Sequence, residues 1–396
     1  GYENFIKHLL KDFPLEEKGL RLYCDKIKEV CDKFPMYNLR SGGDFNEKSS
    51  VMEIDTRTFI ESVTADKKLQ AVLAGNNMLY VLQSYKTPFY VHAMILNSYI
   101  ESSWKCIDGG SAIGKLIAKN IHEQGGVIHR NAEVTKIIVE EGKVNSVQLK
   151  DGSHIYGKTF ISNMHPARTM EFTETNLIKQ AYKSRIQGLE NSIGGFILNI
   201  VLKKNCYKYE KHNYYYHKEG QVWSMTDYTE ANWPTSYSIF FSASSRSEEY
   251  AESITILTLM KFDEVRKWEN SFNTVSENED RGEDYDAFKK HKAETLLDLV
   301  EEKFPGLKDC IKSYYSSTPL TYRDYIGNAD GSMYGIAKDY KNPLKTFISP
   351  RTKLPNLYLT GQNLNLHGIL GAAMSGLVTC TAFLGNDDII KKIRNA

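Results

Sequence analysis

Several catalytic signatures are missing from this sequence of 396 residues. It contains no H-E-x-x-H, no G-x-S-x-G, no C-x-x-C and no G-x-G-x-x-G element. The first two are the residue patterns of zinc hydrolases and serine hydrolases, so neither class is indicated and we predict no metal site. The formal net charge of +1 gives no electrostatic case for binding nucleic acid.

Cysteines and long apolar runs are also sparse. The cysteines stand at positions 24, 31, 106, 206, 310 and 380 without a regular framework, which favours a reducing compartment over a disulfide scaffold. We therefore expect a cytoplasmic protein, with membrane association left open, and we interpret Cys24 and Cys31 as packed free thiols. No apolar run approaches the roughly 18 to 20 residues of a membrane-spanning helix, and no signal peptide opens the chain.

The composition is that of a folded protein. Hydrophobic residues make up 41% and charged residues 25%, which argues against general disorder. A chain of this length exceeds what one hydrophobic core usually serves, so two interleaved domains are expected.

Apolar residues recur at helical spacing over residues 2–81, and a second helical stripe runs through residues 111–124. Short strands are expected at 127–129, 134–139 and 144–149, the last two as an antiparallel pair. The run from Gly109 to Lys115 resembles a phosphate-binding loop, but Leu116 stands where that loop needs Ser or Thr. A helix start with a solvated lysine is therefore favoured over an NTPase site.

The middle of the chain predicts an antiparallel sheet with strands at 195–202, 214–225 and 254–262, followed by a helix at 293–304. Tyrosines gather in residues 207–216. They would either line an apolar cavity or lie on a half-exposed sheet, and we favour the sheet.

The most informative segment is Asn356 to Gly376, which reads as a short apolar strand, a polar loop and the start of a small-residue helix. Gly361 allows the backbone to approach a ligand closely, and Gly368 and Gly371 allow a tight helix entry. The free N–H groups of such an entry attract anions or electron-rich ring edges. The segment therefore predicts a cofactor site, in which His367 is either a contact or, as we favour, a solvated loop residue.

Residues 356–376 resemble the cofactor segment of the superfamily of flavin-dependent phytoene desaturases, carotenoid isomerases and retinol saturases (all-trans-retinol 13,14-reductases). A second matching block spans residues 108–138 and continues through Gly142, 151–152 and 161–163. Weaker likeness at 318–319 and 331–335 extends the resemblance over most of the chain.

The resemblance implies a mixed α/β fold, with an incomplete FAD-binding Rossmann-like domain and an antiparallel-sheet substrate domain with a helical cap. Residues 1–104 would form the cap, 105–166 and 345–396 parts of the FAD-binding domain, and 167–344 the substrate domain. The family's opening strand, G-x-G-x-x-G turn and helix are expected to be missing, because no such turn occurs here.

The same resemblance assigns cofactor-binding positions. Val134 would offer backbone groups to the adenine, although an ordinary strand valine is equally compatible. A close approach to the flavin is assigned to six residues of the C-terminal segment: Gly361, Gln362, Ile369, Leu370, Gly371 and Ala372. A small-residue helix that only packs tightly is the alternative for these, and no catalytic residue is assigned.

We therefore expect a FAD-dependent oxidoreductase acting on C=C bonds of an isoprenoid or other long apolar substrate, bound in a tunnel between the 167–344 sheet and the cap. The alternative is a non-catalytic remnant, a binding or interaction domain that cannot hold FAD without the diphosphate turn. A homodimer and a peripheral membrane contact are left open, and no nucleic-acid partner is expected.

Overall fold

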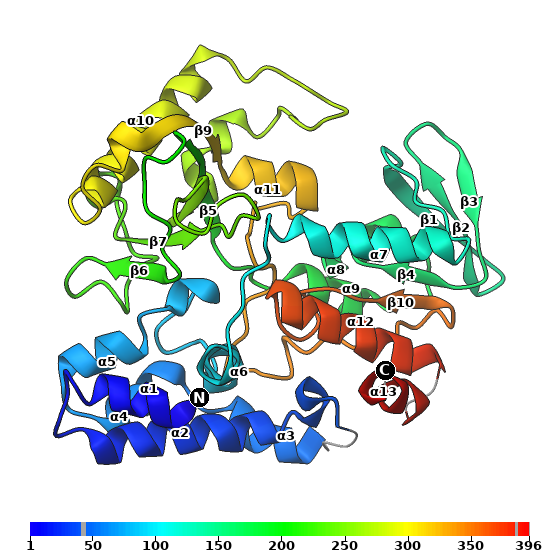
Figure 1. Cartoon of the computed structure of the whole chain (residues 1–396). Coiled ribbons are helices and arrows are strands. Elements are labelled where there is room, and N and C mark those ends of the chain that lie inside the picture. Colours follow the sequence, from blue (N-terminus) through cyan, green and yellow to red (C-terminus); the bar gives the residue numbers. More distant parts are fainter. Residues whose placement is uncertain (41–44, 385–386, 396) are drawn as a thin grey trace. The chain divides into compact units, whose positions relative to one another are not determined.

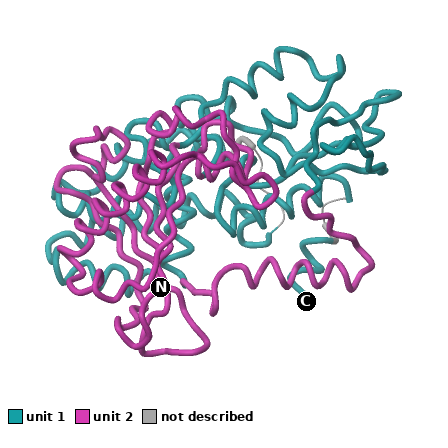
Figure 2. The backbone as a smooth tube through the Cα atoms, turned by 90° about the horizontal axis from the view of Figure 1, so that it is seen from above, with its two compact units in different colours: residues 1–102, 132–192, 334–396 teal, residues 103–131, 193–333 magenta. Residues whose placement is uncertain are grey.

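The computed structural model describes residues 1–40, 45–384 and 387–395. The chain forms two compact units, which Figure 2 shows in different colours, and Figure 1 labels the helices and strands. Unit 1 comprises residues 1–102, 132–192 and 334–396, and unit 2 comprises residues 103–131 and 193–333.

Unit 1 begins with a helical region, as the spacing of apolar residues predicts. The stripe of Leu20, Tyr23 and Ile27 is fully buried, which fixes α2 against α6. Asp55 and Asp66 cap the N-termini of α4 and α5 through their carboxylates. The elements are α1 (Tyr2–Leu9), α2 (Glu17–Asp32), η1 (Pro35–Asn38), α3 (Phe45–Met52), α4 (Thr56–Val63), α5 (Lys67–Leu73), η2 (Asn77–Leu79) and α6 (Phe89–Glu101).

A buried histidine organises this helical region. Nε2 of His92 lies 2.6 Å from the hydroxyl of Tyr23, and Nδ1 lies 2.6 Å from the hydroxyl of Tyr80. A neutral imidazole accepts a hydrogen bond from one hydroxyl and donates one to the other, whereas a protonated ring would have to donate to both. Burial accordingly lowers the pKa of His92 to about 3.

This site makes unit 1 sensitive to acid. The pKa of His92 is lower in the folded chain than in the unfolded one, so its stabilising contribution is complete above about pH 6.5 and is lost as the pH falls toward 3. We expect the free energy of unfolding to fall by about 2 kcal/mol from this group between pH 7 and pH 5. Urea unfolding at both values measures it. His92→Gln should be less stable at pH 7, but its free energy of unfolding should fall less between pH 7 and pH 5 than that of the wild type. The same fall in both proteins would show that His92 is not the source of the acid sensitivity.

The rest of unit 1 combines a hairpin sheet, a small parallel sheet and helices. Strand β1 pairs antiparallel with β2 and β2 with β3, while β10 pairs parallel with β4. The buried core beneath them includes Leu357 and Leu359 of β10 together with Ile137 of β1. The elements are β1 (Val134–Glu140), β2 (Lys143–Leu149), β3 (His154–Tyr156), β4 (Phe160–Ser162), α8 (Pro166–Phe172), α9 (Gln180–Gln187), β10 (Leu357–Leu359), α12 (Gly368–Leu384) and α13 (Asp387–Arg394).

Unit 2 is built on a five-stranded antiparallel sheet in the order β6-β7-β8-β5-β9. Burial alternates along the second part of β5, where Leu198 and Ile200 are buried, while most residues of β7 and β8 are buried. The elements are α7 (Ser111–Glu123), β5 (Gly194–Leu202), β6 (Asn213–His217), η3 (Glu230–Asn232), β7 (Ser236–Phe241), β8 (Ser253–Met260), η4 (Phe262–Glu264), η5 (Arg266–Trp268), α10 (Glu283–Glu301), η6 (Lys308–Cys310), β9 (Ile311–Ser317) and α11 (Pro319–Ile326).

An ionic cluster anchors α11 within unit 2. The carboxylate of Asp324, whose side chain is fully buried, pairs with both Arg281 and Arg323. It also accepts a hydrogen bond of 3.0 Å from the backbone N–H of Asn273. Arg323 in turn donates to the carbonyl oxygens of Glu269 and Ser271. The cluster therefore ties the loop before α10 to α11.

The mixed α/β fold with an antiparallel sheet is confirmed, and several local predictions need correction. Residues 127–129 form no strand, and the predicted strand at 214–225 is limited to β6, beyond which the chain turns. The apolar stripe predicted for residues 111–124 exists on α7, but no residue of that helix is buried. The tyrosines of β6 are half-buried, as a half-exposed sheet requires.

The cysteines are partly paired. Cys206 and Cys310 form a disulfide within unit 2, so the expectation of a chain without disulfides is wrong at these two positions. Cys24 and Cys31 are free and buried, as predicted. In the part of the chain that the structure describes, no helix has both the length and the apolar character needed to cross a bilayer. The four functional ranges assigned from the resemblance stay a prediction.

Candidate functional site

A tightly held loop joins β10 to α12 in unit 1. The hydroxyl of Ser375 on α12 donates to the carbonyl oxygen of Gly361 at 2.8 Å, and that of Thr379 donates to Leu359 at 2.9 Å. Gly361 has a φ of +94°, and a Cβ there would lie 1.9 Å from Oδ1 of Asn163. The left-handed conformation and the close neighbour together require glycine at this position.

The first turns of α12 present apolar side chains outward. Ile369 is 66% exposed and Leu370 47% exposed, and Ala372 is exposed beside them. Gly371 is buried on the opposite side, where a Cβ would lie 2.2 Å from the carbonyl oxygen of Leu366. The loop thus turns back closely on the helix, whose first N–H groups have no partner within the helix.

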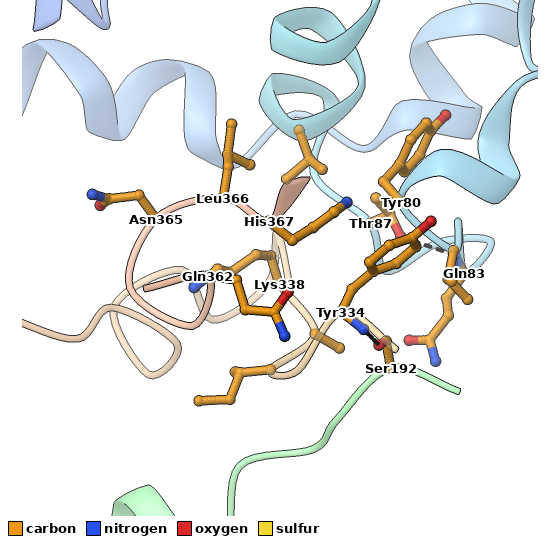
Figure 3. A pocket seen from close by; sticks show the side chains of 14 residues that line it. Tyr80, Gln83, Thr87, Ser192, Tyr334, Lys338, Gln362, Asn365, Leu366 and His367 are labelled. Atoms are coloured by element: carbon orange, nitrogen blue, oxygen red, sulfur yellow. Dashed lines mark hydrogen bonds between the residues drawn. The ribbon is translucent and has the colours of Figure 1, made fainter. Parts of the chain in front are cut away.

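A small polar cavity of about 30 Å³ lies beside this loop (Figure 3). Gln362 and His367 of the loop line this cavity. Tyr334, the first residue of the range 334–396 of unit 1, lines it as well. The rings of Tyr334 and His367 stack with centroids 4.1 Å apart, and Nε2 of His367 donates to the carbonyl oxygen of Leu79 at 2.7 Å. Burial lowers the pKa of His367 to about 4, so the imidazole is neutral near pH 7.

Lys338 lines the same cavity. Its ammonium group is enclosed and donates to three backbone carbonyl oxygens, those of Thr346, Asn363 and Leu364, at 3.2 to 3.3 Å. Burial lowers the pKa of Lys338 to about 8. The lysine therefore ties its own segment to the loop before α12.

A larger cavity of about 330 Å³ shares Lys338, Asn365 and Leu366 with the polar one. Its volume falls at the lower end of the roughly 300–1,000 Å³ of small-molecule sites. Apolar side chains dominate the lining, with Phe34, Met36, Met52, Met94, Phe347, Ile348, Leu364 and Val378 among them. The loop before α12 consequently forms a wall of both cavities.

The structure places the residues of the predicted cofactor site in two groups. Gln362 lines the polar cavity and Gly361 begins the loop, while the exposed turn of α12 carries Ile369, Leu370 and Ala372, with Gly371 on its buried side. Val134 pairs with Leu149 at the start of β1 and lines neither cavity. The assignment of all seven residues to a cofactor stays a prediction.

Strand β10 is nevertheless tethered to the β1–β2 hairpin. The side-chain amide of Asn356 exchanges two hydrogen bonds of 2.8 Å with the backbone of Val144, and Val144 pairs with Val139 of β1. The C-terminal block of the family resemblance therefore meets the end of the second block, from residue 132 onward, within unit 1, whereas residues 108–131 belong to unit 2.

Sequence reasoning missed three residues of the site and misjudged a fourth. Lys338, Tyr37 and Tyr334 line the cavities, yet no motif or spacing marks the first two. Tyr334 belongs to the block 331–335, so the resemblance gave a signal for it. His367 is half-buried, hydrogen-bonded and stacked, so the favoured interpretation as a solvated loop residue is wrong.

Curated relatives are similar over almost the whole chain. All-trans-retinol 13,14-reductase from Danio rerio is 25% identical, covering 98% of this chain and 69% of the relative. Prolycopene isomerase of Daucus carota, a chloroplastic protein, is 24% identical, covering 95% of this chain and 62% of the relative.

The fold has a counterpart among solved structures. A triple mutant of putrescine oxidase shares it with a TM-score of 0.58 and 8% identity, covering 95% of this chain and 76% of that chain. The model of the family described as flavin containing amine oxidoreductase matches residues 25–384. The superfamily expected from residues 356–376 is confirmed, and the chain belongs to the flavin containing amine oxidoreductase family.

Proposed function

We propose that this chain binds a long apolar substrate for a flavin-dependent reaction at its C=C bonds. The observation that carries this proposal is the apolar cavity of about 330 Å³, one wall of which is the loop that leads into α12. Relatives named for retinol and for prolycopene support it, because both molecules are extended, apolar and conjugated. The substrate tunnel expected between residues 167–344 and the cap involves both units and stays a prediction.

The residues present fit one part of FAD. Gly361 keeps the loop free of a Cβ, and the outward-facing Ile369, Leu370 and Ala372 offer an apolar surface beside the free N–H groups of α12. A flavin bound there would supply the hydride chemistry. The role of the chain is then to orient the apolar substrate and to keep water from its reacting carbons. Val134 is proposed to meet the adenine through its backbone.

The diphosphate part of FAD fits less well, because the glycine turn that normally grips it does not occur in the sequence. A second candidate function is a binding domain that takes the apolar ligand in the cavity of about 330 Å³ without catalysis. A homodimer and a peripheral membrane contact are also proposed, and the exposed apolar stripe of α7 supports either.

Titration of flavin fluorescence separates the two candidates. We expect both FAD and FMN to be quenched, with FAD bound at least as tightly as FMN, because the ring portion is common to both and the proposed contact of the Val134 backbone with adenine is possible only for FAD. Ile369→Asp should weaken both affinities at least about tenfold, since a carboxylate would face the electron-rich edge of the ring. The same carboxylate is compatible with the helix N-terminus, so the variant should stay folded.

Leu384→Asp is the matched control, because Leu384 lies at the other end of α12 and is also 66% exposed. It should leave flavin quenching unchanged. Equal quenching by the wild type and Ile369→Asp would show that the flavin ring does not bind at α12. No quenching by either flavin would favour the non-catalytic binding domain.

A further inference from the structure

The charged groups that line the apolar cavity are all positive, and the other polar lining residues, Tyr37, Tyr90, Thr346 and Asn365, are neutral. Lys338 and Lys48 line it together with Tyr37, and no aspartate or glutamate lies among the described residues that line it or the adjoining polar cavity. Neither lysine forms an ion pair within the described part of the chain. An apolar chain with a negatively charged end would complement this lining better than a wholly apolar molecule.

The hydroxyl of Tyr37 is buried and has no hydrogen-bond partner among the described residues. A buried hydroxyl without a partner costs free energy, so its presence in a cavity wall points to a partner that a ligand brings. Burial, with a smaller contribution from Tyr90, raises the pKa of Tyr37, so the phenol keeps its proton and acts as a donor.

Lys338 contributes a positive charge, whereas Tyr37 contributes a hydrogen-bond donor that has no partner among the described residues. Its three bonds to carbonyl oxygens are longer than the usual 2.9 to 3.0 Å and leave the positive charge without a negative counterpart. An ion enclosed in apolar surroundings gains most from an opposite charge, because the effective dielectric constant is low there. The carboxylate of a ligand would supply that charge.

We propose that the cavity between η1, α6 and the loop before α12 binds a long-chain carboxylate, with its head group at Tyr37 and Lys338 and its chain along the methionines and phenylalanines. This rests on the proposed function only in treating the ligand as the substrate class, since binding itself needs no flavin. A fatty acid or an isoprenoid acid has the required chemistry, and an alcohol or ester of the same length lacks the charge.

The test compares oleate with oleyl alcohol as competitors for cis-parinarate fluorescence, using the full chain without added flavin. We expect oleate to bind at least about tenfold more tightly than oleyl alcohol at pH 7, since a hydrogen bond to a charged group contributes that much. Lys338→Met and Tyr37→Phe should each remove most of the preference by weakening oleate and leaving oleyl alcohol nearly unchanged. Lys341→Met is the control, because this exposed lysine lines neither cavity.

The pH dependence of the wild type provides a second readout that needs no variant. Lys338 is charged below about pH 8 and loses its proton above it, so oleate affinity should fall between pH 7 and pH 9.5 while oleyl alcohol affinity stays constant. The other titratable groups facing Lys338 or the cavity are Lys48, Tyr37, Tyr90 and His367. Of these, the two phenols and the neutral imidazole keep their protonation states over this range.

Equal affinities for oleate and oleyl alcohol in the wild type would overturn the proposal. An oleate preference that survives both Lys338→Met and Tyr37→Phe would also overturn it. If neither flavin is quenched but oleate still binds more tightly than oleyl alcohol, the cavity is a carboxylate site without the proposed catalysis. Failure of the proposed function is thus distinguishable from failure of the carboxylate proposal.

Discussion

Replacing Gly371 by alanine is expected to destabilise unit 1 by about 3 kcal/mol or more. The new Cβ would lie 2.2 Å from the carbonyl oxygen and 2.5 Å from the carbonyl carbon of Leu366. Both are backbone atoms of the loop that walls the two cavities, so the strain cannot be relieved by a rotating side chain. Overpacking of this kind typically costs about 1–3 kcal/mol and more where the backbone must move.

Gly376→Ala on the same helix is the control. Nothing lies within 4 Å of a Cβ at that position, and alanine is the better helix former, so the variant should be more stable by about 0.5–1 kcal/mol. Urea unfolding monitored by circular dichroism gives both values. If the two alanine variants unfold at the same urea concentration, the loop and the helix do not approach each other this closely.

Removal of the Asp324 carboxylate by Asp324→Ala is expected to destabilise unit 2 by about 3–5 kcal/mol. The side chains of Arg281 and Arg323 are 6% and 9% exposed, and both would lose their only carboxylate partner among the described residues. Breaking a buried pair leaves an uncompensated charge, which costs far more than the pair contributes. The backbone N–H of Asn273 would lose its acceptor as well.

An exposed ion pair of the same unit shows the contrast. Asp298 and Lys308 approach to 2.5 Å, but their side chains are 67% and 44% exposed. Asp298→Ala should therefore change the free energy of unfolding by no more than about 1 kcal/mol. Thermal and urea unfolding of both variants test the difference, and an Asp324→Ala protein as stable as Asp298→Ala would show that the cluster is solvated.

Local patterns in the sequence predicted much of the architecture. The buried stripe of α2, the hairpin of β1 and β2 and the short strand before Gly361 each follow from periodicity and turn residues over fewer than 20 positions. The glycines of residues 356–376 also indicated a tight strand-to-helix connection, and the structure shows why Gly361 and Gly371 are needed. These features depend on neighbours in the chain.

Features that depend on distant residues could not be predicted in this way. Tyr37 and Lys338 come to one cavity from segments some 300 positions apart, and nothing local to either residue marks them. The stripe of α7 has the periodicity of a buried helix, yet it is exposed, because periodicity shows which face is apolar and not what covers it. Residues 127–129 have strand propensity but no strand to pair with.

The link between Cys206 and Cys310 encloses β6, β7, β8 and α10 in one covalent ring. The ring closes beside the seam where Leu202 of β5 already pairs with Ile311 of β9. Chain-entropy reasoning assigns a closed loop of this size a stabilisation of about 4–5 kcal/mol, all of it through the denatured ensemble. The stability of unit 2 consequently depends on whether its surroundings oxidise or reduce thiols, whereas Cys24, Cys31 and Cys380 of unit 1 are free.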